Sequence, residues 1–337
     1  MLRNISAKKR WRSTDLTSVE AQCIFAATEQ STQQEEQPLD TSATGGLPET
    51  RPDGTAGLTR PSRALIGWML PAQAEMVLGG NMIGKETSTQ HRELARSARE
   101  AVASRPIGID QTDITSDPPP ELEEHISQLR QSSAGAAMFQ QGCDVVLVDL
   151  TRVCAFQPTV VADAAIERVQ DVKADDLAAI AAITLPTRAA EPPRIQFDQS
   201  RQLYMVASPD LNLQIVGYVS GPAPDGSGAV ALGFTVMAAP SFLNVVRFQD
   251  RVLLRDGYHR AYGFLNHGIT HVPAFIRTME AIEDVIPPGT FLPQHSYLGD
   301  RPPVLPDYLD DRVASTVRLP AVQKMVVIQG IQMTPGA

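Results

Sequence analysis

The stretch Leu253–Ile276 reads LLRDGYHRAYGFLNHGITHVPAFI, and its order of residue types decides the fold. The apolar residues of Arg251–Leu254 predict a buried strand. A helix is expected to follow the turn and to run to about Asn266, because Gly268 is the kind of residue that ends helices in the left-handed conformation. His271–Arg277 then predicts a strand that returns to the core.

The turn between that strand and helix carries the candidate functional residues. Asp256 is expected to cap the helix, and Gly257 lets the backbone turn sharply and lets a ligand approach closely. The N–H groups of Tyr258, His259 and Arg260 should then point outward beside the positive end of the helix dipole, which favours anions. Arg260 adds a planar fork of donors that suits phosphate, and His259 can donate a hydrogen bond or transfer a proton near neutral pH. The turn is therefore predicted to hold an anion, most plausibly a phosphate group.

Purely structural interpretations of the same residues remain open at this point. An Asp-Gly pair after a strand is a common turn, and a Tyr-His-Arg trio can form a solvated first helical turn. Arg260 could also pair with a carboxylate in the core. His259, His267 and His271 are close in sequence, but His271 lies beyond the expected helix end, so no metal site is predicted.

Outside this stretch, the chain divides by composition. We predict a disordered leader over residues 1–62, because the stretch EQSTQQEEQ and the residues after it offer little apolar surface to bury. A helical extension is expected over 63–137, an α+β domain over 138–282, and a Pro-rich tail with a terminal strand or two over 283–337. The expected order of strands and helices is typical of an α+β fold.

Hydrophobic periodicity and turn residues place the individual elements. Helices are expected as two short ones between Ala64 and Gly79, then at Thr87–Ser104, Glu121–Gln131, Val160–Gln170 and Ala174–Ile183. Strands are expected at Asp144–Leu150, Ile195–Phe197, Leu203–Ser208, Leu213–Val219, Phe234–Met237 and Asn244–Phe248, the second and third forming a hairpin.

The bulk properties exclude several classes of protein. A formal net charge of −9 argues against broad electrostatic capture of nucleic acid. No apolar run of about 18 residues exists, so no membrane span is expected. The three cysteines form no CxxC pair, which together with the lack of a secretory signal favours a reducing, cytoplasmic location.

The segment Leu253–Ile276 resembles the second signature of the ParB/sulfiredoxin-like superfamily. In that family a strand leads into a Gly-containing turn that ends in Arg, then into a helix and a Gly-Ile/Leu-x-x-Ile/Val-Pro segment. Pro240–Val246 resembles the short strand before the turn. Val148-Asp149-Leu150, Phe156-Gln157-Pro158 and the helix ADDLAAI resemble the family's opening strand, turn and first helix. The resemblance covers about residues 143–277.

The resemblance implies that a nucleotide phosphate, which commonly travels with Mg²⁺, is held by Gly257, Tyr258, His259 and Arg260. Arg255 and Gln157 are further candidates. Sulfiredoxin has a catalytic Cys where this chain has Tyr258, so repair of sulfinic acid is not expected. The chromosome-partitioning members have a Glu-Arg-Arg turn and a helix-turn-helix domain that residues 280–337 are too short to form. The turn of the serine kinase, Asp-Gly-His-Thr-Arg, is closer to this one.

The sequence thus predicts a nucleotide-binding protein, and a phosphotransferase or nucleotide hydrolase is one form of it. In that form His259 is the acid or base and Asp256 orients the turn. The alternative is a non-enzymatic module that binds nucleic acid or a partner protein through the same turn, and the acidic balance of the chain speaks against nucleic acid.

Overall fold

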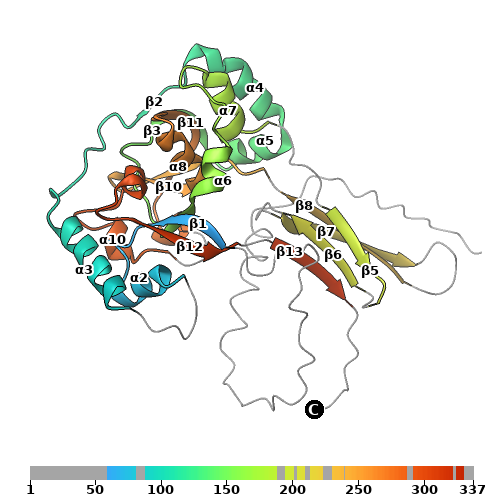
Figure 1. The fold of residues 1–337 in the computed structure, drawn as a ribbon. Helices are drawn as coiled ribbons and strands as arrows, with labels where there is room; N and C mark the ends of the chain where they lie inside the picture. Colours follow the sequence, from blue (N-terminus) through green and yellow to red (C-terminus); the bar gives the residue numbers. More distant parts are fainter. Residues whose placement is uncertain are drawn as a thin grey trace, which may run out of the picture. The chain divides into compact units, whose positions relative to one another are not determined.

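The protein is described here by a computed structural model, which covers residues 59–80, 88–187, 194–200, 203–208, 213–222, 230–238, 240–286, 291–321 and 324–329 (Figure 1). Helices combine with mostly antiparallel sheets in the described residues, so the α+β prediction is confirmed. Nearly all of the predicted leader lies outside these residues. Its last part differs from the prediction, because Thr59–Ala64 forms strand β1.

The largest sheet has five strands in the order β10-β9-β11-β3-β2. All neighbouring strands are antiparallel except β9 and β11, which are parallel. The central strands read as β-branched and Leu runs, as expected for strands covered on both faces. In sheet order the strands are Arg251–Asp256 (β10), Asn244–Phe248 (β9), His271–Met279 (β11), Asp144–Asp149 (β3) and Thr115–Ser116 (β2).

A second sheet joins segments that are distant in the sequence. It has the order β12-β1-β4, in which β12 is Ser315–Pro320 and β4 is Thr159–Val161. Both pairings are antiparallel, and Arg63 of β1 lies between Val160 and Thr316. One hydrophobic core contains residues from before 80, from the central region and from after 290. The core therefore does not divide at the predicted boundaries near 137 and 282, and the expected Pro-rich tail is part of it.

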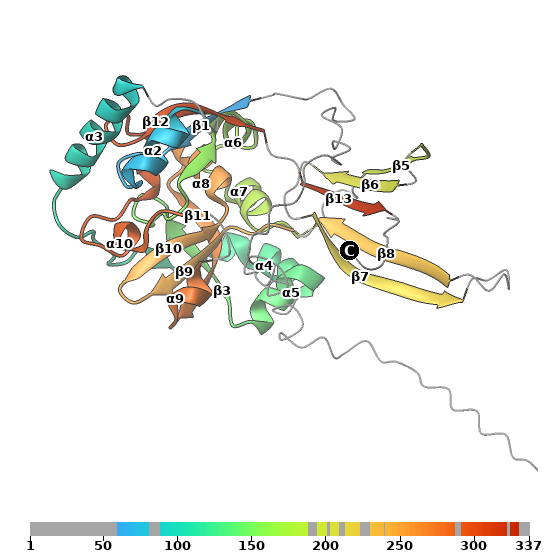
Figure 2. The same cartoon turned by 90° about the horizontal axis from the view of Figure 1, so that it is seen from below.

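The helices surround these two sheets, and Figures 1 and 2 show α2 and α3 close together and α4 beside α5. Ser88 caps α3 by accepting a hydrogen bond from the His91 N–H, and Asp176 caps α7 by accepting one from the Ala179 N–H. The α-helices are Pro71–Leu78 (α2), Thr89–Ala103 (α3), Glu123–Gln131 (α4), Ser133–Gln140 (α5), Ala162–Glu167 (α6), Leu177–Thr184 (α7), Tyr258–Asn266 (α8), Ile282–Val285 (α9) and Gln294–Tyr297 (α10). Short 3₁₀ turns cover Pro120–Leu122 (η2) and Leu305–Leu309 (η3).

Two smaller sheets are formed by the four strands between residues 194 and 238 together with one strand from 324–329. One has the order β13-β6-β5 and contains the predicted hairpin, in which Phe197 faces Tyr204. The other is the long hairpin β7-β8. Their strands are Lys324–Gln329 (β13), Leu203–Ser208 (β6), Arg194–Asp198 (β5), Leu213–Pro222 (β7) and Val230–Ala238 (β8).

Two helix predictions need correction. The first of the two helices expected after Ala64 is absent, because β1 ends at Ala64 and a turn leads directly to α2. The helix expected from Val160 begins at Ala162, because Thr159–Val161 pairs with β1. Both errors have one cause: local periodicity does not indicate a strand whose partner is distant in sequence.

Candidate functional site

The predicted turn joins β10 to α8, and Gly257 controls its shape. Gly257 has a φ of 98°, the left-handed region in which side chains are strained. A Cβ at this position would also lie 3.1 Å from the Leu243 Cα and 3.2 Å from an Arg260 guanidinium nitrogen. Glycine is therefore required both by backbone conformation and by space. Outside α8, no described residue accepts a hydrogen bond from the backbone N–H of Tyr258 or of His259.

Asp256 holds the turn from outside the helix. It is the last residue of β10, and Gly257 takes the N-cap position, so the prediction that Asp256 is the N-cap was wrong by one residue. Its carboxylate accepts a hydrogen bond from the Gly257 N–H at 2.6 Å and one from the Ser241 hydroxyl at 2.9 Å. The side chain is exposed, so its negative charge lies beside the entrance to the helix terminus.

Arg260 is a buried structural residue in this geometry. Its guanidinium donates to the Ser241 hydroxyl at 2.8 Å, to the Ser241 carbonyl and, at 3.2 Å, to the Ile183 carbonyl. Only 5% of its surface is exposed. The expected open fork of donors is thus directed at protein oxygens, which ties α8 to the segment before β9 and to the last turn of α7. Of the predicted alternatives, the interior role fits best, and the Ser241 and Ile183 oxygens are among the partners of the guanidinium.

Tyr258 and Gln157 face the interior rather than a ligand. The Tyr258 hydroxyl accepts a hydrogen bond from the Phe156 N–H at 3.0 Å, and burial raises the pKa of Tyr258 far above its usual range. The Gln157 side chain donates to the Thr159 carbonyl at 2.6 Å, and the Gln157 backbone carbonyl accepts from the Tyr308 hydroxyl. These contacts fix the loop after β3 against α8. A ligand could use only the backbone N–H of Tyr258.

Among the predicted site residues, His259 has the geometry that best suits a chemical role. Its imidazole is half-buried and has no hydrogen-bond partner among the described residues. Burial is the largest cause of a pKa of about 4, and the neighbouring Arg168 lowers the pKa next most strongly, whereas Asp256 raises it. The ring is therefore neutral at pH 7, with one N–H donor and one acceptor nitrogen.

Several cations surround this neutral ring. Arg168, the residue after α6, and Arg60 of β1 both act on His259 together with Arg260. Arg60 forms an ion pair with Asp163 at 3.2 Å, but the exposed Arg168 pairs with no carboxylate among the described residues. Arg60, Arg168 and Arg260 each lower the pKa of His259, whereas Asp256 raises it.

The packing of α6 on α8 explains why Arg168 reaches this place. A Cβ on Gly263 would lie 2.3 Å from the Ala165 carbonyl, so the two helices touch backbone to backbone. His259 lies one turn before Gly263 on the same face of α8. Sequence reasoning missed Arg168 and Arg60, because each is distant in sequence and neither forms part of a recognisable motif.

Arg255 does not join this cluster. It lies at the bulge of β10, half-buried, and burial lowers its pKa first, followed by the nearby Arg277. It remains charged at neutral pH, because an arginine is deprotonated only far above that range. The structure thus places Arg255 with Arg277 of β11, and not with His259.

The described residues contain neither a side-chain cluster for a metal ion nor a helix that could span a membrane. Within that part of the chain, no group of three or more His, Cys, Asp or Glu side chains is arranged to hold a metal ion. No helix in the same residues is long and apolar enough to cross a membrane.

Comparison of the chain with protein-family models, with curated proteins and with solved structures finds no match.

Proposed function

We propose that this protein binds a phosphate-bearing small molecule, a nucleotide in the first instance, at the N-terminus of α8. The observation that carries the proposal is the exposed Arg168 beside a neutral His259, at a helix terminus whose first N–H groups are available. The resemblance to the ParB/sulfiredoxin-like superfamily, and with it the assignment of that fold, belongs to the same proposal.

The roles within the turn follow from the contacts. Gly257 brings the backbone close to the ligand, and the N–H groups of Tyr258 and His259 donate hydrogen bonds to phosphate oxygens. The exposed Arg168 supplies positive charge at the rim. Arg260 supports the turn from behind through Ser241. This division differs from the sequence-based expectation, in which Arg260 met the ligand directly.

A catalytic form of the proposal rests on His259. A neutral imidazole with a pKa of about 4 can accept a proton but is a poor source of one at pH 7. His259 would therefore act as a general base toward a hydroxyl or water that attacks a phosphoryl group, and Asp256 would orient the turn. Product release from a nucleoside triphosphate with Mg²⁺, compared between the native chain and His259→Gln, tests this form.

Calorimetric titration of the full chain tests binding. The ligands are inorganic phosphate, nucleoside mono-, di- and triphosphates with and without Mg²⁺, and the unphosphorylated nucleoside. We expect only the phosphorylated compounds to bind, and Arg168→Ala to weaken them about threefold to tenfold, as loss of one exposed charge contact does. Arg96→Ala, an exposed arginine on α3, is the matched control and should bind normally.

Asp256→Asn gives a second test, in which the affinity for phosphorylated compounds should rise and not fall. Asparagine keeps an acceptor for the Gly257 N–H but removes the negative charge beside the phosphate. Affinity should rise about twofold to fivefold, and it should rise less at high salt. Absence of binding by every phosphorylated compound, or an Arg168→Ala protein with native affinity, would overturn the proposal. Salt-dependent binding of DNA in their place would favour the alternative module.

A further inference from the structure

A pocket beside α3 combines apolar walls with an arginine, and it shares no residue with the turn described above. Its volume is about 450 Å³, within the range of small-molecule sites. One wall is the C-terminal part of α3, and a second is the turn from β1 into α2. The third wall is formed by α10 and the residues that follow it.

The wall from α3 carries Arg99, Val102 and Ala103, which share one face because residues three and four apart on a helix are neighbours. Val102 packs directly against the turn between β1 and α2. A Cβ on Gly67 would lie 2.8 Å from the Val102 Cγ2 and 3.1 Å from the Ala98 carbonyl oxygen. The missing side chain at Gly67 thus lets α3 lie close to the turn, with Arg99 at the wall one helical turn before Val102.

The wall from the turn is apolar and fixed in place. The Trp68 indole N–H donates to the Arg301 carbonyl at 2.7 Å, and the Arg105 guanidinium lies 5.0 Å from the centroid of the indole ring. Met69 is buried beside it, whereas Leu70 is 52% exposed, although its side chain is large and apolar. A ligand with an apolar body therefore meets a preformed surface, and little order has to be created on binding.

Arg99 brings a positive charge that no described residue satisfies. It forms no hydrogen bond or ion pair with a described residue, and its Nη1 atom is buried without a partner. Removal of a guanidinium nitrogen from water without a partner is unfavourable, and an anion can offset that cost. The donor fork of an arginine matches a carboxylate.

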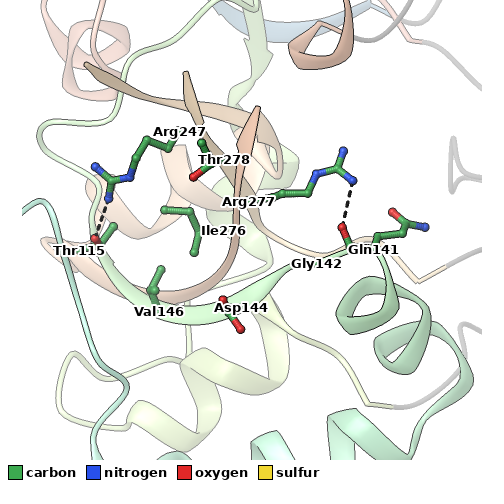
Figure 3. A pocket seen from close by; sticks show the side chains of 9 residues that line it. All are labelled: Thr115, Gln141, Gly142, Asp144, Val146, Arg247, Ile276, Arg277 and Thr278. Carbon is green, nitrogen blue, oxygen red and sulfur yellow. Dashed lines mark hydrogen bonds between the residues drawn. The ribbon is translucent and has the colours of Figure 1, made fainter. Parts of the chain in front are cut away.

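The groove on the large sheet lacks such an arginine. Figure 3 shows its two arginines, Arg247 and Arg277, on opposite faces of the sheet, as the pairing of β9 with β11 requires. The Arg247 guanidinium donates to the Thr115 hydroxyl at 3.2 Å, and the Arg277 guanidinium donates to the Gln141 carbonyl at 3.3 Å. Each of them already has a protein partner, in contrast to Arg99.

The other ionisable lining residues favour a ligand with a single acid group. The Arg301 Nε donates to the Arg105 carbonyl at 2.6 Å, so that guanidinium is partly engaged. Asp300 is exposed and places a negative charge in the lining, which disfavours a polyanion. The exposed His295 is neutral or cationic and adds no negative charge.

We propose that this pocket binds a small monocarboxylate with an apolar body. The carboxylate pairs with Arg99, and the apolar body lies against the turn and the adjacent face of α3. The site goes beyond phosphate binding at α8 and is independent of it, since the two share no residue.

Tryptophan fluorescence makes the test specific for this pocket. The chain has two tryptophans, Trp11 and Trp68, so the full chain with Trp11→Phe reports on Trp68 alone. Acetate, butyrate, hexanoate and octanoate vary the apolar body, octanol removes the charge and octylamine reverses it. We expect affinity to rise with chain length, and octanoate to bind at least about tenfold tighter than octanol or octylamine.

Variants then assign the contacts. Arg99→Ala should lower the affinity for octanoate about tenfold or more, to that of octanol, and should leave octanol binding unchanged. Leu70→Ser should weaken octanoate more than butyrate, because only the longer body covers the apolar wall. Asp300→Asn should raise the affinity for octanoate about twofold. Arg96→Ala, an exposed arginine on the same helix but outside the pocket, is the matched control and should bind normally.

Circular dichroism and calorimetry on the same preparations complete the test. If Arg99→Ala fails to fold, Arg99→Lys and Arg99→Gln replace it, and lysine should weaken binding less than glutamine because it keeps the charge. Arg168→Ala, which tests the site at α8, should bind octanoate with native affinity. The proposal is overturned if octanoate binds no tighter than octanol, or if a folded Arg99→Ala protein keeps native affinity. It is equally overturned if calorimetry detects octanoate binding while the Trp68 emission stays unchanged.

Discussion

Replacement of Arg260 by alanine should destabilise the fold strongly, because its guanidinium bonds to the interior. The variant removes hydrogen bonds to the Ser241 hydroxyl, the Ser241 carbonyl and the Ile183 carbonyl. Hydrogen bonds from a charged donor contribute roughly 1.5–3 kcal/mol each, but such contributions from one side chain are not additive. Two carbonyls also lose a partner in a place where water has little access. We expect a loss of about 3–5 kcal/mol in the free energy of unfolding.

Urea denaturation followed by circular dichroism measures this loss, with the native chain and two further variants beside it. Arg260→Lys should lose an intermediate amount, because an ammonium keeps the charge but does not span the same acceptors. Arg168→Ala, at an exposed position near the same turn, should stay within about 0.5 kcal/mol of the native chain. A folded Arg260→Ala protein within about 1 kcal/mol of native stability would refute the structural role and would restore Arg260 as a candidate ligand contact.

Three further predictions follow from the same region and from the chain start. Gly257→Ala should lower the free energy of unfolding by about 2–3 kcal/mol, because the new Cβ meets backbone strain and a contact of 3.1 Å with the Leu243 Cα. Gly268→Ala should lower it by about 1 kcal/mol, because Gly268 has a φ of 74° but open space around it. Equal losses in urea denaturation would contradict the contact. NMR titration should show His259 with a pKa near 4. Because the unfolded chain binds this proton already near pH 6.5, the free energy of unfolding should be highest above pH 6.5 and should fall by at most about 3 kcal/mol as the pH drops toward 4. A titration midpoint near 6.5 would show that the ring is solvated. Deletion of residues 1–58 should change the thermal midpoint by less than about 2 °C, because their composition offers few core-forming residues, and a large fall would reveal a structural segment.

Local patterns predicted the elements whose signals are contained within the element itself. The strand Asn244–Phe248 has the predicted bounds, and the helix that ends before Gly268 ends as expected, with Gly268 at a φ of 74°. Strand β3 was likewise evident from its unbroken apolar run. In each case, residue type at one position or over a short run specifies the backbone conformation.

The sheet β12-β1-β4 escaped prediction because its pairings connect distant segments. Arg63 lies opposite Val160 and Thr316, and no local periodicity records such a pairing. The same limit applies to the sites. His259 was identified from its own turn, but Arg168 precedes it by a long stretch of chain and becomes visible only when α6 packs on α8.

The bulge in β10 explains how one short motif came to contain residues with different tasks. Asp256 turns toward Ser241 and the α8 terminus, whereas its neighbour Arg255, at the bulge, is influenced most by burial and then by Arg277. The sequence placed Arg255 with the phosphate site because it is adjacent to Asp256 in the chain. The bulge between Leu254 and Asp256 interrupts the regular alternation of side chains, so adjacency in the sequence does not fix which face Arg255 takes.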